Sequence, residues 1–424
     1  MSTEARWLKY QMESDFLPSD FVNCTGLRFC LANGAAPLRW VQNTNGEVDK
    51  KDHVYEFAME FNVPLVKEVP GLKDVALNLA GRRAKYENFD AGDSWKIGLN
   101  WQIVDWVRFR GTLSSDFRAP NMNNLYEPIG VTSTGFQDRL TGVSNQGMRL
   151  FTGGNPDLTP ETAKTKTAGL VFTPSFIQRF SFAVDYYETR MTNAITQISY
   201  QNDTIQGLCL ASAPRYDSPF CTLAIRPITD VNDPNYTLPV NAPTAIRNAP
   251  ANSSLVKTRG FDFQIDYNVD LGGGQFSFRH LANYQPTNST LNTPASTFYT
   301  WAVQPHLMQT TFMNYSHSGW NVSLANRWLS NVSLKTSDNS LNPASNQHYV
   351  DSSLDAYDIV DVTIDKEFEF NDSMIDAYLT VNNLLDQRVP LYGSNSGLPG
   401  LFYPTLGFYD DMGRYFTLGF RAKF

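Results

Sequence analysis

The sequence predicts an all-β protein whose antiparallel strands form a transmembrane barrel. Two observations carry this prediction. Apolar and polar residues alternate along one stretch after another from residue 54 onward, and the connections between these stretches are short and long in turn. In addition, no stretch approaches the roughly 20 consecutive apolar residues that a membrane-spanning helix needs.

The closing segment, YFTLGFRAKF, shows the alternation most clearly. Successive side chains of a strand point to opposite faces, so one face takes Phe416, Leu418, Phe420 and Phe424, and the other begins with Tyr415. The same pattern recurs in HVYEFAMEFNVPL, SWKIGLNWQIV, GFDFQIDYNVD and MIDAYLTVNN. A soluble antiparallel sheet would show this alternation with its apolar face turned inward, so the strands alone do not decide.

The connections decide in favour of the membrane. Short turns are expected near residues 66–74, 104–105, 174–179, 271–274, 317–319 and 369–373. Longer connections are expected near 118–163, 190–254, 287–304, 331–356 and 386–412, with a shorter one near 87–93. Outer-membrane barrels have tight turns at one rim and long loops at the other, and each strand exposes an apolar face to lipid. We therefore expect the apolar faces to contact outer-membrane lipid.

The strand count indicates how much of a barrel is present. Thirteen full strands are expected, and the first and last both run from the long-loop rim to the short-turn rim. Two such strands cannot pair antiparallel. Either residues 4–11 supply one more ascending strand, or further strands lie outside this sequence, which is the alternative we favour. Residues 1–52 are then a segment like an extracellular loop that could hold a partial strand, and residues 53–424 are the carboxyl-terminal part of a larger barrel.

The net charge, the amino-terminal sequence and the cysteines indicate which type of protein this is and in which compartment it folds. A net charge of −8 argues against nucleic-acid binding, which favours a basic face. The amino terminus shows no secretory signal, so either the protein stays inside the cell or this chain is not the whole precursor. Cys24 with Cys30 and Cys209 with Cys221 form two close pairs in polar stretches, which favours disulfides and an oxidising compartment. Free thiols or half of a metal site are the alternative.

The sequence gives little evidence for a catalytic site or a metal site. Three acidic pairs have i, i+4 spacing on predicted strands: Glu56/Glu60, Asp262/Asp266 and Asp361/Asp365. On one strand such residues lie about 13 Å apart, whereas glycosidase carboxylates need roughly 5–9.5 Å. Partners on neighbouring strands could be closer. The five histidines lack HxH or HExxH spacing. We therefore predict no catalytic residue, no metal site and no cofactor.

The long connections hold the candidate ligand contacts. Residues 201–254 contain the pair Cys209/Cys221 and many prolines, which restrict a loop that would otherwise move. This restriction either stabilises the loop or presents a binding surface. Aromatic side chains in other loops could stack on or hydrogen-bond a bulky polar ligand: Tyr126, Tyr299, Trp301, Tyr392 and Tyr403.

Four stretches resemble a known family. SSDFRAPNMNNLYEP at 114–128, GGNPDLTPETAKTKTAGLVF at 153–172, VNNLLDQR at 381–388 and the closing strand are similar, in this order, to the barrel of TonB-dependent outer-membrane receptors. The resemblance implies a 22-stranded barrel with a plug domain and a TonB box before it, neither of which this sequence shows. It also implies that the closing strand is read by the outer-membrane assembly machinery, through Tyr415, Phe416, Leu418, Phe420 and Phe424.

The resemblance implies a function in the bacterial outer membrane. Family members take up a scarce ligand too large for porins, such as an iron–siderophore complex, cobalamin or an oligosaccharide, and TonB drives the step through the plug. Two other classes remain. A passive porin would share the barrel but lack the paired motifs at 114–128 and 153–172. A soluble carbohydrate-binding protein or glycosidase would turn its aromatic faces inward.

Overall fold

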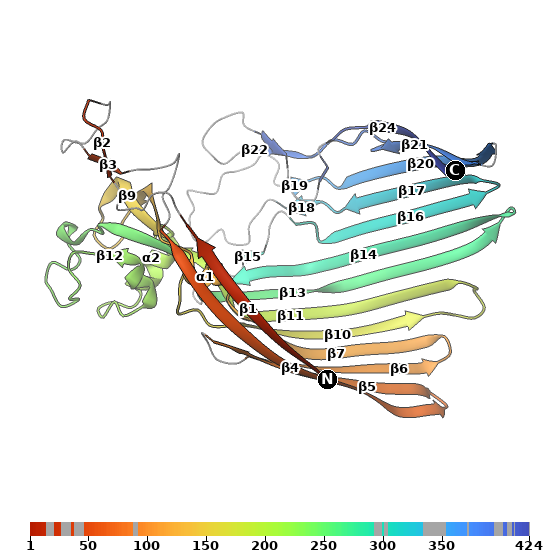
Figure 1. Ribbon diagram of the computed structural model, residues 1–424, viewed down its shortest axis with the longest axis horizontal. Coiled ribbons are helices and arrows are strands. Elements are labelled where there is room, and N and C mark those ends of the chain that lie inside the picture. Colours follow the sequence, from red (N-terminus) through yellow and green to blue (C-terminus); the bar gives the residue numbers. More distant parts are fainter. Residues whose placement is uncertain are drawn as a thin grey trace.

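The protein is a strongly curved wall of long antiparallel strands with folded loops at one end (Figure 1). The computed structural model describes residues 1–13, 21–26, 35–37, 46–87, 92–291, 299–300, 304–333, 353–370, 373–393, 402–404, 409–410 and 412–423. In this part of the chain the main sheet has 18 strands. Fourteen of them form the wall. The other four lie in the long connections: β8 (Gly130–Gln137), β9 (Ser144–Thr152), β12 (Ala224–Ile225) and β15 (Tyr299–Thr300).

The wall strands follow the chain order. They are β1 (Ser2–Met12), β4 (Val48–Val69), β5 (Leu72–Tyr86), β6 (Gly92–Val104), β7 (Val107–Arg118), β10 (Glu161–Phe172), β11 (Phe180–Ser199), β13 (Ala245–Leu271), β14 (Gly274–Leu291), β16 (Leu307–His317), β17 (Trp320–Leu329), β20 (Tyr357–Phe370), β21 (Ser373–Asn382) and β24 (Tyr415–Lys423). Each pairs antiparallel with the next one named.

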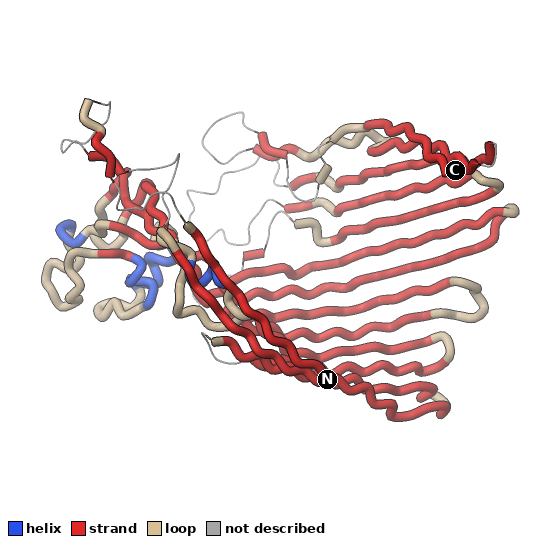
Figure 2. Tube along the Cα trace, in the orientation of Figure 1, coloured by secondary structure: helices blue, strands red, loops and turns tan. Residues whose placement is uncertain are grey.

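The two ends of the wall differ as the connection lengths predict. Tight turns, such as Pro70–Gly71 and Gly272–Gly273, join strands at one end, whereas the long connections and the helices gather at the other (Figures 1 and 2). We call this second end the rim. Within the described residues, none of the helices has the length and apolar character that crossing a bilayer would require.

The first strands begin earlier than the sequence suggested. β1 pairs with β4 over the whole of Ser2–Met12, so the ascending strand considered for residues 4–11 is present. An ion pair between Arg6 and Glu56 joins the two strands. β4 begins at Val48, ahead of the boundary expected at residue 53.

The two faces of the wall differ as the alternation predicts. On β24, Phe416, Leu418 and Phe420 are 66%, 69% and 70% exposed, so large apolar side chains point away from the protein. The opposite face is polar and lines a hollow of about 790 Å³ that includes Glu60, Arg110 and other charged groups. The predicted all-β antiparallel fold with an apolar outer face is thus confirmed.

The described parts of the long connections hold more secondary structure than expected. β11 runs on to Ser199 and β13 starts at Ala245, so the connection predicted at 190–254 is shorter, because these two strands keep pairing beyond the wall. The connections also contain α1 (Met122–Tyr126), α2 (Asp203–Leu210), the 3₁₀ helices η1 (Pro219–Leu223) and η2 (Pro239–Asn241), and the strands β8 (Gly130–Gln137), β9 (Ser144–Thr152) and β12 (Ala224–Ile225). Smaller strands are β2 (Phe21–Asn23), β3 (Ala35–Pro37), β15 (Tyr299–Thr300), β18 (Val332–Ser333), β19 (Ser353–Leu354), β22 (Leu391–Gly393) and β23 (Phe402–Pro404).

A glycine makes room for an ion pair that crosses three strands of the inner face. Gly169 of β10 lies in register between Arg110 of β7 and Asp185 of β11. Arg110 donates to Asp185 through Nε at 2.8 Å and through Nη2 at 2.6 Å. A Cβ at position 169 would lie 2.7 Å from the Asp185 Cγ. The bidentate pair therefore depends on the missing side chain of Gly169.

We expect Gly169→Ala to destabilise the wall, because the added methyl group displaces the Asp185 carboxylate from Arg110. Overpacking of this kind costs about 1–3 kcal/mol. The matched control is Gly81→Ala on β5, where an added Cβ meets nothing within 4 Å. Urea unfolding of the purified protein, followed by tryptophan fluorescence, measures both. Equal unfolding midpoints for the two variants would contradict the role given to Gly169.

Candidate functional site

A buried carboxylate ties three strands together where the wall meets the rim. Glu161, the first residue of β10, is 2% exposed. It accepts a hydrogen bond from Arg118 Nε at the end of β7, and its Oε1 accepts one from the backbone N–H of Ile195 on β11 at 2.6 Å. Arg118 and Glu161 belong to the two motifs at 114–128 and 153–172, so the motifs meet in space.

The same two motifs also interlock through their backbones. Asn121 caps α1, since its side chain accepts from the N–H of Asn124 at 2.7 Å. Gly154 then donates to the Glu127 carbonyl at 2.9 Å, and Asn155 donates to the Asn124 carbonyl at 2.8 Å. A Cβ at Gly154 would lie 2.6 Å from the Glu127 nitrogen. The glycine is therefore required for this close approach, which fixes where the long loop leaves and re-enters the wall.

Two long connections fold into one unit, which we call the loop subdomain (residues 130–152 and 199–250). β8 and β9 form an antiparallel hairpin, and β9 pairs in parallel with the start of β13, with Ala245 opposite Arg149 and Arg247 opposite Phe151. Beneath it lies a buried apolar cluster of Phe136, Met148, Ile198, Tyr200, Ile205, Cys209, Leu223, Ala224 and Ile246. The loops therefore have a hydrophobic core, to which the rim ends of β11 and β13 contribute Ile198 and Ile246.

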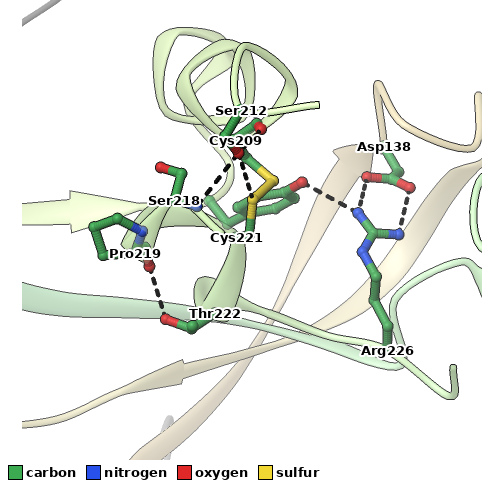
Figure 3. The surroundings of a disulfide bond; sticks show 9 residues. Asp138, Cys209, Ser212, Ser218, Pro219, Cys221, Thr222 and Arg226 are labelled. Carbon is green, nitrogen blue, oxygen red and sulfur yellow. Dashed lines mark hydrogen bonds and ion pairs between the residues drawn. A yellow bond between two sulfur atoms is a disulfide. The ribbon is translucent and has the colours of Figure 1, made fainter. Parts of the chain in front are cut away.

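A disulfide and a buried ion pair close the loop subdomain (Figure 3). Cys209 at the end of α2 is bonded to Cys221 in η1. The side chains of Asp138 and Arg226 are 1% and 5% exposed and form two hydrogen bonds, at 2.7 and 2.9 Å. Burial by itself would raise the pKa of Asp138, but hydrogen bonds from Arg226 and Thr141 hold that pKa below its usual value. Asp138 is therefore a carboxylate at neutral pH.

The loop subdomain and the wall enclose a groove of about 820 Å³, which we call the rim groove. It is lined by Phe151 near the end of β9, by Asn155 in the chain that follows, and by Arg247 of β13. Phe220 of η1 also lines it. Aromatic rings and a few polar groups in a concave site are typical of small-ligand binding. The rim groove is the candidate functional site.

The loop aromatics predicted from the sequence are not brought together at the rim groove. Tyr126 lies on α1, with Lys50 Nζ 5.5 Å from its ring centroid. Tyr299 pairs in backbone register with Thr290, and Tyr392 pairs with Tyr403 in a separate two-stranded sheet. Trp301 lies outside the described residues. These residues remain predicted ligand contacts.

The other predicted site residues are placed as follows. Cys24 is disulfide-bonded, and Cys30 lies outside the described residues. Tyr415, Phe416, Leu418 and Phe420 lie on β24, and Phe424 lies outside the described residues. In the described part of the chain, no group of three or more His, Cys, Asp and Glu side chains is placed to hold a metal ion.

Phe151 and Arg247 are not among the individual residues predicted for the site, although Arg247 lies in the connection 201–254. Phe151 and Arg247 lie in segments expected to be loops, yet both are strand residues. The alternation in SNQGMRLFT at 144–152 is a signal that could have revealed β9. No local signal marks the pairing of Asp138 with Arg226, because the two residues lie far apart in the sequence.

Comparison with known proteins gives a family match and structural matches. The model of the family described as TonB dependent receptor-like, beta-barrel, matches residues 32–384. A mutant of the ferric enterobactin receptor PfeA from Pseudomonas aeruginosa, in complex with enterobactin, aligns with a TM-score of 0.62 and 14% identity over 99% of this chain. The siderophore receptor PirA from Acinetobacter baumannii aligns with a TM-score of 0.61 and 13% identity, also over 99%.

The chain spans about half the length of these solved structures, 51% and 52% respectively. At these identities the likeness shows a shared fold. A search of curated protein sequences gave no match.

Removing Arg226 should unfold the loop subdomain locally. In Arg226→Met the Asp138 carboxylate stays buried without its partner, which costs about 3–5 kcal/mol. The double variant Asp138→Leu/Arg226→Met removes both charges and should recover most of that loss. Amide hydrogen exchange in residues 203–225, measured by mass spectrometry, reports the change. If the double variant exchanges as fast as the single one, the ion pair is not the cause.

Acid should loosen the loop subdomain through Asp138. Because its pKa is lower in the folded state, the unfolded state binds protons more readily. The contribution to stability is therefore complete above the unfolded pKa of about 3.9 and is lost as pH falls below that value. Pepsin cleavage of the loop subdomain should rise between about pH 4 and pH 2. Asp138→Asn should show a flatter pH profile, and identical profiles would exclude Asp138 as the responsible group.

Proposed function

Because the chain belongs to the TonB-dependent receptor-like β-barrel family and is thus an outer-membrane protein, we propose that it takes up a scarce, bulky ligand from outside the cell. The family consists of transporters rather than enzymes. The external loops would capture the ligand, and the barrel would carry it across the membrane in a TonB-dependent manner.

One observation supports this proposal: two long connections at the rim fold into one unit. A porin needs only a polar passage, whereas here two long connections share a core, a disulfide and a buried ion pair, and they enclose the rim groove. Preorganised loops cost little entropy on binding and so raise affinity. A rim built in this way suits the capture of a ligand present at low concentration.

Tight capture also explains why energy would be needed. A ligand held at nanomolar affinity lies about 12 kcal/mol below its free state and leaves slowly without help. In our proposal TonB supplies this energy through a plug domain outside residues 1–424. The candidate ligands are iron–siderophore complexes, cobalamin and oligosaccharides. The structures that this chain resembles include receptors for siderophores, which makes these the first ligands to test.

Uptake by cells tests the proposal. Disrupting the gene in the native organism should abolish uptake of one labelled ligand among a panel of ferric siderophores, cobalamin and oligosaccharides. In wild-type cells a protonophore should stop the same uptake. A variant lacking residues 203–241 should still reach the outer membrane on an immunoblot but capture at least tenfold less ligand. Uptake that continues after the protonophore would instead support a passive porin.

A further inference from the structure

We propose that the rim groove binds an anionic aromatic group, held by the guanidinium group of Arg247 and by the ring of Phe151, on which Arg149 stacks. The proposal rests on the proposed function and deepens it by naming the chemistry of the ligand. Arg149, Phe151 and Arg247 themselves lie outside the motifs at 114–128 and 153–172.

The strand register places these three side chains on one face. Arg149 and Phe151 are two residues apart on β9, and Arg247 is the register partner of Phe151 on β13. Residues two apart on a strand share a face, and paired strands lie about 4.8 Å apart. The opposite face carries Met148 and Ile246, which are buried in the core of the loop subdomain. Folding of that core therefore fixes the cationic and aromatic face toward the outside.

The charges on this face are uncompensated. Both arginines are exposed, and among the described residues neither forms an ion pair. Arg149 Cζ lies 5.0 Å from the Phe151 ring centroid, so one guanidinium already stacks on the ring. Asp157 is the one acidic residue among those that line the rim groove, and it is exposed. Arg226 of the same subdomain differs, because Asp138 neutralises it.

An anionic ring satisfies both features at once. A guanidinium binds a carboxylate or phenolate by charge-assisted hydrogen bonds, which can be bidentate. Phe151 and Phe220 offer apolar area and edge or face contacts to an aromatic ring. On the inner face of the wall, by contrast, Arg110 is bound to Asp185, and that guanidinium is already occupied. The rim groove therefore offers an incoming anion an arginine side chain, Arg247, that no carboxylate of the described chain neutralises.

Direct binding of small probes tests this chemistry without the natural ligand. The purified protein, in a zwitterionic detergent, is titrated into 2-naphthoate, and binding is followed by the fluorescence anisotropy of the probe. 2-Naphthalenemethanol has the same ring without the charge, and cyclohexanecarboxylate as a competitor has the charge without the ring. Empty micelles correct for partitioning into detergent. We expect naphthoate to bind at least tenfold more tightly than the neutral alcohol and cyclohexanecarboxylate to compete poorly.

Variants locate the binding. Arg247→Gln should weaken naphthoate binding at least tenfold, Arg247→Lys should weaken it less, and Phe151→Leu should weaken naphthoate but not cyclohexanecarboxylate. The matched control is Arg179→Gln at the short-turn end, which should change nothing. Amide hydrogen exchange in residues 203–225 verifies that each variant keeps its fold. Equal binding of the charged and neutral probes to the wild type would overturn the proposal, as would unchanged binding to a folded Arg247→Gln variant.

The two proposals fail in different experiments. If naphthoate binding depends on Arg247 but the gene is not needed for uptake, the proposed transport function is wrong and the proposed binding site stands. If gene disruption abolishes uptake but the purified protein binds naphthoate and 2-naphthalenemethanol equally, the proposed binding site is wrong and the transport function stands.

Discussion

A strand in lipid can satisfy its backbone N–H and C=O groups only on neighbouring strands, and the rest of this protein depends on that constraint. It accounts for the unbroken antiparallel pairing from β1 to β24 in the described chain. The side chains of the outer face are apolar because they contact lipid, whereas the inner face is polar and charged groups pair across its strands. The ion pair between Arg110 and Asp185 crosses β10 because Gly169 leaves the space for it.

Beyond the wall, water can satisfy backbone N–H and C=O groups, so strand pairing is no longer required. The loops are stabilised in another way. A short peptide segment cannot bury enough apolar surface by itself, so small folded units often rely on staples such as disulfides. Here the connections after β7 and β11 share one apolar cluster, and Cys209–Cys221 with Asp138–Arg226 close it. The motif residues Arg118, Glu161 and Gly154 anchor the first of these connections to the wall.

The arginines of the loop subdomain divide into two kinds. Arg226 is buried against Asp138, so its charge serves the fold and removing it leaves a costly carboxylate. Arg149 and Arg247 stand on the outer face of the same small sheet. One side of the sheet packs on the core, and the other carries Arg149 together with Phe151 and Arg247, which line the rim groove. The strand pair β9–β13 thus carries core residues on one face and the proposed ligand contacts on the other.

The sequence by itself determined the strands, their two faces and the two ends of the wall. These features repeat with period two or recur at every second connection, so they are local and can be read without coordinates. The order of four motifs likewise indicated the family that residues 32–384 match. Only the tertiary structure decided how the loops fold. The contacts of Glu161 with Arg118 and Ile195, of Asp138 with Arg226, and of β9 with β13 join residues that are distant in the sequence. Such contacts leave no periodic pattern, because each depends on where the wall brings two strand ends together in space.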